Sequence, residues 1–228
     1  MRSAAALARR HPRLYHMTEA GNGEAIRRRG LWSTRLLLER NGVPEAEREA
    51  IEASRRPAPV KLADGTVIRD NGVLRENLLA PLLPDGVAPR DWYLLLNAHV
   101  FFWPSQAALA RLLGAGAYRT ASHDVLEFDA ASLLSAHAQR VRLTPMNTGA
   151  TGRTRPERGP GAFVPLSAWP VPPGTPYWST PSGKPRPVRE VAVRDGVPDA
   201  ADHLLRITRR RAGAEPEPVW SRLTAVAE

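Results

Sequence analysis

The sequence predicts an α+β fold in a single domain, and three observations support this class. Strand-like runs such as "HVFFW" and "VREVAV" lie among helix-like runs such as "SQAALARLLGAG", without regular alternation of the two kinds. No internal repeat is visible. The chain has 228 residues, 43% of them hydrophobic, which is enough for one well-buried core. We expect the domain at 13–211, with an N-terminal tail or short helix at 1–12 and a weakly ordered C-terminal tail at 212–228.

The first third of the chain is expected to hold one strand, three helices and a hairpin. These elements are predicted, in this order, at 13–17, 19–30, 33–42, 43–56 and 60–72. Gly30 would end the first helix, because glycine readily adopts the left-handed conformation that closes a helix. Ser33 or Thr34 would cap the start of the second helix. The Asp64-Gly65 pair between apolar residues is typical of a hairpin turn.

The rest of the chain is expected to alternate between strands and helices around one long loop. Strands and helices are predicted, in this order, at 99–104, 105–116, 123–129, 130–141 and 188–193. Ser105 would cap the start of the helix at 105–116. Residues 89–97 fit either a helix or a strand, and 198–209 fit a helix or a strand that leads into a helix. Residues 144–187 hold many Pro, Gly, Thr and Arg residues, so we expect a long irregular loop there.

The charge of the chain fits two kinds of surface. The net charge is +9 and the isoelectric point is about 11.0, values typical of proteins that bind nucleic acids. Lys61 and Lys184 are the two lysines, so 30 of the 32 basic residues are arginine, and they are spread along the chain. Both a solvated basic surface and a surface that binds a polyanion fit this distribution.

Several classes of site are excluded or disfavoured by composition. The chain has no cysteine, which excludes disulfides and zinc sites built from thiolates. The six histidines show no tight ligand spacing, so no metal site is predicted. No stretch approaches the roughly 18 apolar residues of a membrane span, and the N-terminal Ala-Leu run is too short and too charged for a secretion signal. We therefore expect a soluble, cytoplasmic protein without membrane contact, and the oligomeric state is left open.

Two residues stand out before any comparison with a family. His16 lies between bulky neighbours in a short strand, where a ring bonded to a backbone carbonyl would explain it as well as a ligand would. Glu190 shares one face of its strand with Val188 and Ala192, because side chains alternate along a strand. An unpaired buried carboxylate is costly, so Glu190 either opens on a cleft or pairs with an arginine.

A resemblance to a known superfamily is carried by three motifs taken together. They are "LYHMT" followed by "AIRRRGLWST", then "HVFFW", and then "VREVAV" followed by "VPDAADHL". Over about residues 13–206 they resemble the ADP-ribosyltransferase-like superfamily, and most of all the DarT-like DNA-modifying toxins and the RNA 2′-phosphotransferases. The whole chain also resembles a bacterial family of unknown function. The resemblance implies a split β-sheet core, mixed or antiparallel, with peripheral helices, and an enzyme that uses NAD as a substrate.

The resemblance implies a role for one or two residues of each motif. His16 would bind the adenosine ribose as a hydrogen-bond donor, with Thr18 beside it. Phe101 takes the position of the strand aromatic, where the family more often has Tyr, and would pack against nicotinamide. Glu190 would bind the nicotinamide ribose and act as the catalytic residue. Cleavage of the bond to nicotinamide passes through an oxocarbenium-like state, which a nearby carboxylate stabilises.

The long loop precedes the last motif, and the resemblance implies that it recognises the acceptor. Arg153, Arg155 and Arg158 would then contact phosphates, and Trp169 or Trp178 would stack on a base. A loop that merely covers the sheet with its aromatic side chains is the alternative.

The functional prediction is NAD-dependent ADP-ribosyl transfer, or NAD hydrolysis, with nucleic acid as one candidate acceptor. The diphosphate of NAD needs cationic partners, and four unranked candidates are Arg29, Arg35, Arg119 and Arg153. Two alternatives stay open. One is an enzyme similar to the RNA 2′-phosphotransferases, and the other is a non-catalytic basic module that binds nucleic acid or protein.

Overall fold

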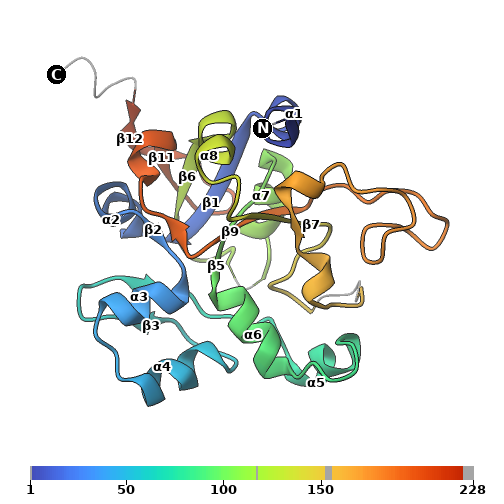
Figure 1. The fold of residues 1–228 in the computed structure, drawn as a ribbon. Coiled ribbons are helices and arrows are strands. Elements are labelled where there is room, and N and C mark those ends of the chain that lie inside the picture. The colour runs from blue at the N-terminus through green and yellow to red at the C-terminus, as the bar shows by residue number, and fades with distance from the viewer. Residues whose placement is uncertain (1, 117, 152–155, 223–228) are drawn as a thin grey trace.

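The chain folds around two four-stranded sheets, in which every described pairing is antiparallel (Figure 1). The computed structural model describes residues 2–116, 118–151 and 156–222. In spatial order, the first sheet consists of β1 (Arg13–Glu19), β6 (His123–Asp129), β11 (Leu204–Arg210) and β12 (Glu217–Ser221). The second sheet consists of β5 (His99–Phe102), β9 (Glu190–Arg194), β7 (Val141–Thr144) and β8 (Val164–Pro165). Two short pairs join β2 (Leu31–Trp32) to β10 (Gly196–Val197) and β3 (Val60–Lys61) to β4 (Val67–Ile68). The predicted α+β class in a single domain is confirmed.

The two sheets meet where β1 passes the end of β5. Tyr15 and Trp103 exchange a pair of backbone hydrogen bonds there, with N···O distances of 2.9 and 2.8 Å. The largest core cluster takes buried side chains from both sheets, among them Leu14 of β1 and Val191 of β9. Because the sheets share this core, side chains on β1 and β9 are held in a defined relative position.

Helices cover the sheets and connect their strands. The α-helices that the structure describes are α1 (Arg2–Arg10), α2 (Asn22–Arg29), α3 (Thr34–Arg40), α4 (Glu45–Glu52), α5 (Glu76–Leu79), α6 (Pro89–Asn97), α7 (Gln106–Leu113), α8 (Ala130–Ala136) and α9 (Ala200–His203). Short 3₁₀ turns are η1 (Ala80–Leu82), η2 (Pro160–Ala162) and η3 (Leu166–Ala168). Ser33 and Ser105 cap α3 and α7 as predicted, because each hydroxyl oxygen accepts a backbone N–H three residues later. No described helix has the length and apolar character needed to cross a membrane.

Helix α1 is part of the packed domain and not a frayed tail. Ala4, Leu7 and Ala8 recur at helical spacing, so they form one apolar stripe, and all three are buried in the main core. The hydroxyl of Ser3 donates a 2.7 Å hydrogen bond to the carbonyl oxygen of Trp169. Helix α1 is therefore fixed against α8 and against the segment that follows β8.

The C-terminal region differs from the prediction in two ways. Residues 198–209 form the short helix α9 first and the strand β11 second, the reverse of a strand that leads into a helix. The expected weak order beyond residue 212 is also wrong for β12, which pairs with β11 at the sheet edge. Trp220 packs against the main core from β12, and this contact gives the edge strand an apolar anchor.

The loop expected at 144–187 contains short elements and folds back on the domain. It includes β8, η2 and η3, and its later part forms the orange segment at the right of Figure 1. Leu166 and Trp178 are buried in the main core, and Trp169 packs against it. Apolar side chains thus anchor a segment whose Pro and Gly content excludes long helices and strands.

Gly30 ends α2 as predicted, and its surroundings leave no room for a side chain. Its φ is +88°, and an added Cβ would lie 2.6 Å from the carbonyl oxygen of Pro198. Gly42 is a matched control, because its φ is +66° and an added Cβ would have nothing within 4 Å. We expect Gly42→Ala to lower the free energy of unfolding by about 1 kcal/mol and Gly30→Ala by at least about 3 kcal/mol. Urea denaturation measures both changes, and equal losses would contradict the role assigned to the Pro198 contact.

Candidate functional site

A cavity of about 1440 Å³ brings together residues from all three motifs. His16 and Thr18 of β1, Phe101 of β5 and Glu190 of β9 all line it. Its volume exceeds the roughly 300–1,000 Å³ that is usual for pockets that bind small molecules. The convergence expected from the motifs is therefore present, although these residues lie far apart in the sequence.

Strand register aims the residues of the second sheet at the cavity. Phe101 pairs with Ala192, and Thr144 pairs with Glu190. Directly paired residues point to the same face of a sheet, as do residues two apart on one strand. Phe101, Glu190 and Thr144 therefore share one face, while Val191 points into the core from the other.

The carboxylate of Glu190 is held by one oxygen and open at the other. Its side chain is buried, with 3% of the residue exposed. Oε2 accepts a 2.7 Å hydrogen bond from the Thr148 hydroxyl and a 3.1 Å bond from the Thr148 backbone N–H, and the Thr144 hydroxyl lies 3.3 Å away. Oε1 accepts no hydrogen bond from any described residue. One oxygen thus fixes the orientation, and the other is left for a ligand.

The environment of Glu190 raises its pKa. Burial is the main cause, because it disfavours the charged form, and it brings the pKa to about 7. The hydrogen bonds from Thr148 and Thr144 and the charge of Arg158 act in the opposite direction. Glu190 therefore exchanges its proton near neutral pH, and a cation in the cavity would favour the carboxylate.

This pKa predicts a pH-dependent effect of Glu190→Gln on stability. Between the unfolded pKa of 4.5 and the folded pKa of about 7, the folded protein binds the extra proton, so the wild type loses stability as pH rises through this window. Glutamine carries no charge, so the variant should match the wild type near pH 4.5 and exceed it by up to about 3 kcal/mol above pH 7. Urea denaturation from pH 5 to 8 measures the difference. The exposed Glu215→Gln is the control, and a gain that does not change with pH would contradict the prediction.

His16 joins the two sheets and keeps one nitrogen for the cavity. Its Nδ1 lies 2.9 Å from the carbonyl oxygen of Phe101, which can only accept, so Nδ1 carries the proton. Burial and, to a smaller extent, the nearby charge of Arg69 lower the pKa of His16 to about 4, while the hydrogen bond to Phe101 acts in the opposite direction. The ring is therefore neutral at pH 7, and Nε2 is an acceptor. A ribose hydroxyl would donate to His16, the reverse of the direction expected from the sequence.

The other two predicted contacts have different surroundings. The Thr18 hydroxyl accepts a 3.0 Å hydrogen bond from the Asn22 side chain, which also bonds to the backbone of Val67. Thr18 therefore helps to attach the β3–β4 hairpin to the cavity wall. Phe101 is half-buried, and its ring centroid lies 6.3 Å from those of His99 and Phe163. The three rings form an aromatic cluster, of which His99 and Phe101 line the cavity together with Glu190.

The structure corrects the prediction for Arg158. Only 1% of the residue is exposed, and its guanidinium donates to the carbonyl oxygens of Pro156, Asn147 and Ala150. It borders the cavity, but these bonds use it to hold the polypeptide around Thr148. Arg153 and Arg155 lie outside the described residues.

The two tryptophans predicted to stack on a base are used inside the domain. Trp178 is 2% exposed, and its indole N–H donates a 3.2 Å hydrogen bond to the carbonyl oxygen of Ala162. Trp169 is half-buried against the main core. For these two residues the structure shows the alternative, in which the aromatic side chains of the loop cover the sheet. Burying indole rings in this way stabilises the fold strongly.

Of the four arginines predicted to contact the diphosphate, two form ion pairs with aspartates, one does not line the cavity, and one is not described. Arg29 lines the cavity but pairs with Asp64 at 3.0 Å. Arg35 pairs with Asp195 and does not line the cavity, and neither does the exposed Arg119. Arg153 is not described.

Other cations of the cavity wall are free. Arg111 and Arg189 are among the residues that line the cavity, and both are exposed. Their side chains make no hydrogen bond or ion pair with any described residue. The N-terminus of α2 is closed to an anion, because Asp124 accepts the backbone N–H groups of Gly21 and Gly23 at 2.8 and 3.1 Å. An anion in the cavity would therefore meet the free guanidinium groups of Arg111 and Arg189.

Sequence reasoning missed the two threonines that orient Glu190. Strand register brings Thr144 opposite Glu190, and the turn that follows β7 brings Thr148 to the same carboxylate. The sequence signal was the polar run "TPMNTGAT", in which hydroxyl and amide residues precede the Glu190 strand by about 45 positions. Nothing in a single sequence pairs that run with β9.

These features define an α+β protein with a large cavity at the joint of two antiparallel sheets. The chain belongs to the family described as "Family of unknown function (DUF7002)", whose model matches residues 12–204. Neither the curated proteins nor the solved structures contain a match to the chain. The family description names no activity, so the chemistry has to be argued from the residues.

Proposed function

We propose that the protein cleaves the bond between nicotinamide and ribose in NAD⁺, and passes the ADP-ribosyl group to water or to an acceptor. The observation that carries this proposal is the cavity, in which the free Oε1 of Glu190 shares a space with His16 and Phe101. In this proposal the fold is of the ADP-ribosyltransferase type. The meeting of two antiparallel sheets, with His16 on one and Glu190 on the other, supports that assignment.

The reaction needs few protein groups. The C1′–N bond breaks, and nicotinamide leaves as a neutral molecule with the bonding electron pair. Positive charge develops on the ribose, and the Glu190 carboxylate stabilises it from the 2′-hydroxyl side. A water or acceptor hydroxyl then bonds to C1′ and loses its proton. Because the nicotinamide ring of NAD⁺ is cationic, its binding also favours the charged form of Glu190.

The remaining groups bind and orient the dinucleotide. The His16 Nε2 accepts from a hydroxyl of the adenosine ribose, and the Phe101 ring packs against nicotinamide. Arg111 and Arg189 bind the diphosphate with their free guanidinium groups. We place this reaction in the cytoplasm. The class of the acceptor stays open. The sequence expectation of a nucleic-acid acceptor loses two of its contacts, because Arg158 and Trp178 are buried.

The surroundings of Glu190 favour an enzyme over a non-catalytic basic module. A structural glutamate would pair with Arg189 or Arg194 at the surface, whereas Glu190 is buried, forms no ion pair with a described residue, and borders the cavity. An enzyme similar to the RNA 2′-phosphotransferases would use the same cavity, and none of the described residues favours it over the proposed reaction.

The test is the release of nicotinamide from NAD⁺ by the purified protein, followed by chromatography. We expect nicotinamide and ADP-ribose to form in equal amounts when no acceptor is present. NAD⁺ should also raise the melting temperature, because a ligand that binds only the folded state stabilises it. The proposal is contradicted if, at millimolar NAD⁺, no product forms and the melting temperature does not rise.

A further inference from the structure

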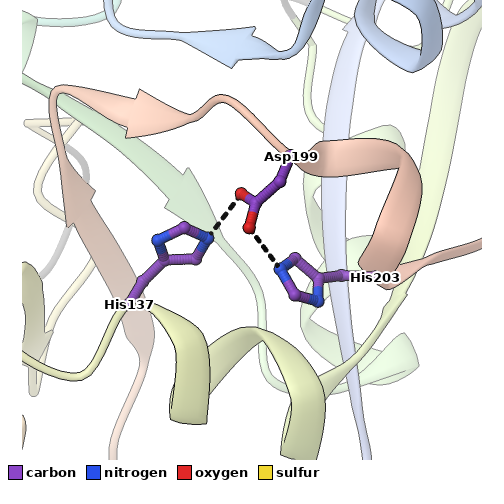
Figure 2. Close-up of side chains that lie close together, drawn as sticks. All are labelled: His137, Asp199 and His203. Carbon is purple, nitrogen blue, oxygen red and sulfur yellow. Dashed lines mark hydrogen bonds and ion pairs between the residues drawn. The ribbon is translucent and has the colours of Figure 1, made fainter.

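A second cluster of polar side chains lies outside the cavity. His137 follows α8, Asp199 precedes α9, and His203 is the last residue of α9 (Figure 2). The Nε2 atoms of His137 and His203 lie 2.8 and 3.3 Å from the two carboxylate oxygens of Asp199. One ligand atom from each of the three residues lies within 4.8 Å of the others. None of the three residues lines the cavity.

The contact between His137 and Asp199 has the distance of an ion pair, 2.8 Å between Nε2 and Oδ1, but not the alignment of a hydrogen bond. His137 Nε2 and Asp199 Oδ1 are both buried, and neither has a hydrogen-bond partner in the structure. Buried polar atoms normally find a partner, so this pair calls for a group that both can contact.

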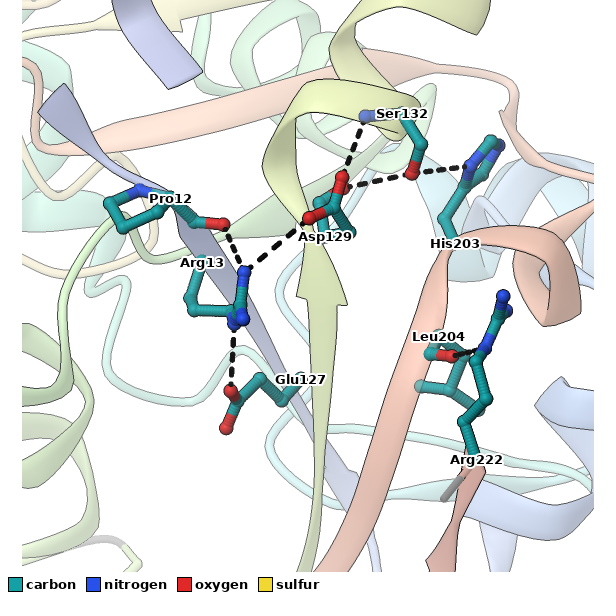
Figure 3. Close-up of polar contacts among 8 residues, drawn as sticks. All are labelled: Pro12, Arg13, Glu127, Asp129, Ser132, His203, Leu204 and Arg222. Atoms are coloured by element: carbon teal, nitrogen blue, oxygen red, sulfur yellow. Dashed lines mark hydrogen bonds and ion pairs between the residues drawn. The ribbon is translucent and has the colours of Figure 1, made fainter. Parts of the chain in front are cut away.

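The orientation of His203 gives independent support. The single hydroxyl proton of Ser132 is directed to the carbonyl oxygen of Asp129, so the Ser132 oxygen accepts from Nδ1 of His203 at 3.0 Å (Figure 3). In the neutral ring this leaves Nε2 unprotonated, and its lone pair faces a carboxylate oxygen 3.3 Å away. A proton or a metal cation between these two atoms would join them, and the second oxygen of the same carboxylate faces His137.

We propose that His137, Asp199 and His203 bind a divalent cation of the zinc class. Two imidazole nitrogens and one carboxylate oxygen are a ligand set that Zn²⁺ accepts with tetrahedral geometry, with water in the fourth position. Solvent reaches the site through Asp199, whose side chain is 37% exposed, while the two histidines are about 6–7% exposed. The hydrogen bond from His203 to Ser132 is the outer contact that fixes the ring of a metal-bound histidine.

Arg140 must move when the cation binds. Its Nη2 lies 2.6 Å from Nδ1 of His137, and coordination through Nε2 places the proton of the ring on that same Nδ1. Arg140 is half-buried and already donates to the carbonyl oxygen of Arg194, so it has another partner. Removing its positive charge should therefore tighten cation binding. The bound cation would connect α8 to the segment between β9 and β11.

The test is calorimetric titration of chelator-treated full-length protein with Zn²⁺ at pH 7.5, with Mg²⁺ as the comparison ion. We expect one Zn²⁺ per chain, no Mg²⁺ binding, and a melting temperature that rises with Zn²⁺. Asp199→Asn and His203→Gln should each weaken Zn²⁺ binding at least tenfold, Arg140→Ala should strengthen it, and the matched control His11→Gln should leave it unchanged.

The proposal is overturned if the wild type takes up no stoichiometric Zn²⁺, or if Asp199→Asn and His203→Gln bind as tightly as His11→Gln. If the ligand variants do not fold, X-ray absorption at the zinc edge of the loaded wild type decides. A spectrum with two imidazole ligands supports the site, and a spectrum without imidazole overturns it. These outcomes do not depend on any activity toward NAD⁺.

Discussion

Glu190→Gln is expected to lower the rate of nicotinamide release by about 100-fold or more, while NAD⁺ still binds. Glutamine keeps the shape of the side chain and an oxygen that can accept from Thr148, so the cavity stays intact. It removes the negative charge that stabilises the oxocarbenium-like transition state, and this charge matters more there than in the bound substrate. The loss should therefore appear in kcat, with a dissociation constant for NAD⁺ that changes little.

The measurement combines single-turnover kinetics with calorimetry of NAD⁺ binding. Glu215→Gln, an exposed change of the same chemistry, should behave like the wild type. In the wild type, the rate should rise with pH and level off above about pH 7, because the active form of Glu190 is the deprotonated one. A Glu190→Gln variant with wild-type turnover would remove Glu190 from the mechanism even if the protein does consume NAD⁺.

Arg158→Met is expected to lower the free energy of unfolding by about 3 kcal/mol or more. Methionine fills much of the same volume but leaves the carbonyl oxygens of Asn147, Ala150 and Pro156 without a donor in a buried region. Thr148 lies in the segment that these bonds hold, so the hydrogen bonds to Glu190 should weaken as well. Turnover should then fall together with stability.

Urea denaturation and nicotinamide release measure the two effects side by side. Arg189→Met is the stability control, because that side chain is exposed and unpaired among the described residues, and its change should stay within about 0.5 kcal/mol. If Arg158→Met instead left stability unchanged and weakened binding of NAD⁺ or nucleic acid, Arg158 would be a ligand-binding residue, as the resemblance to the superfamily implied.

Local rules predicted several parts of the fold well. Ser33, Ser105 and Gly30 lie at helix ends because hydroxyl caps and the left-handed conformation of glycine act within a few residues. The hairpin turn at Asp64-Gly65 follows from the same kind of local chemistry. Whether α1 and β12 are ordered was harder to predict. A short helix and an edge strand become ordered only when the rest of the domain offers a surface on which they can pack.

From the amino-acid sequence we could predict the fold class, the caps and turns, and three residues that the cavity brings together, His16, Phe101 and Glu190. The tertiary structure alone decided how those residues are used. It paired Thr144 with Glu190, gave His16 a proton on the nitrogen that faces Phe101, and buried Arg158 and Trp178. The bond between Thr144 and Glu190 joins residues 46 positions apart, and the bond between His16 and Phe101 joins residues 85 positions apart. No pattern within a short window of sequence contains such contacts.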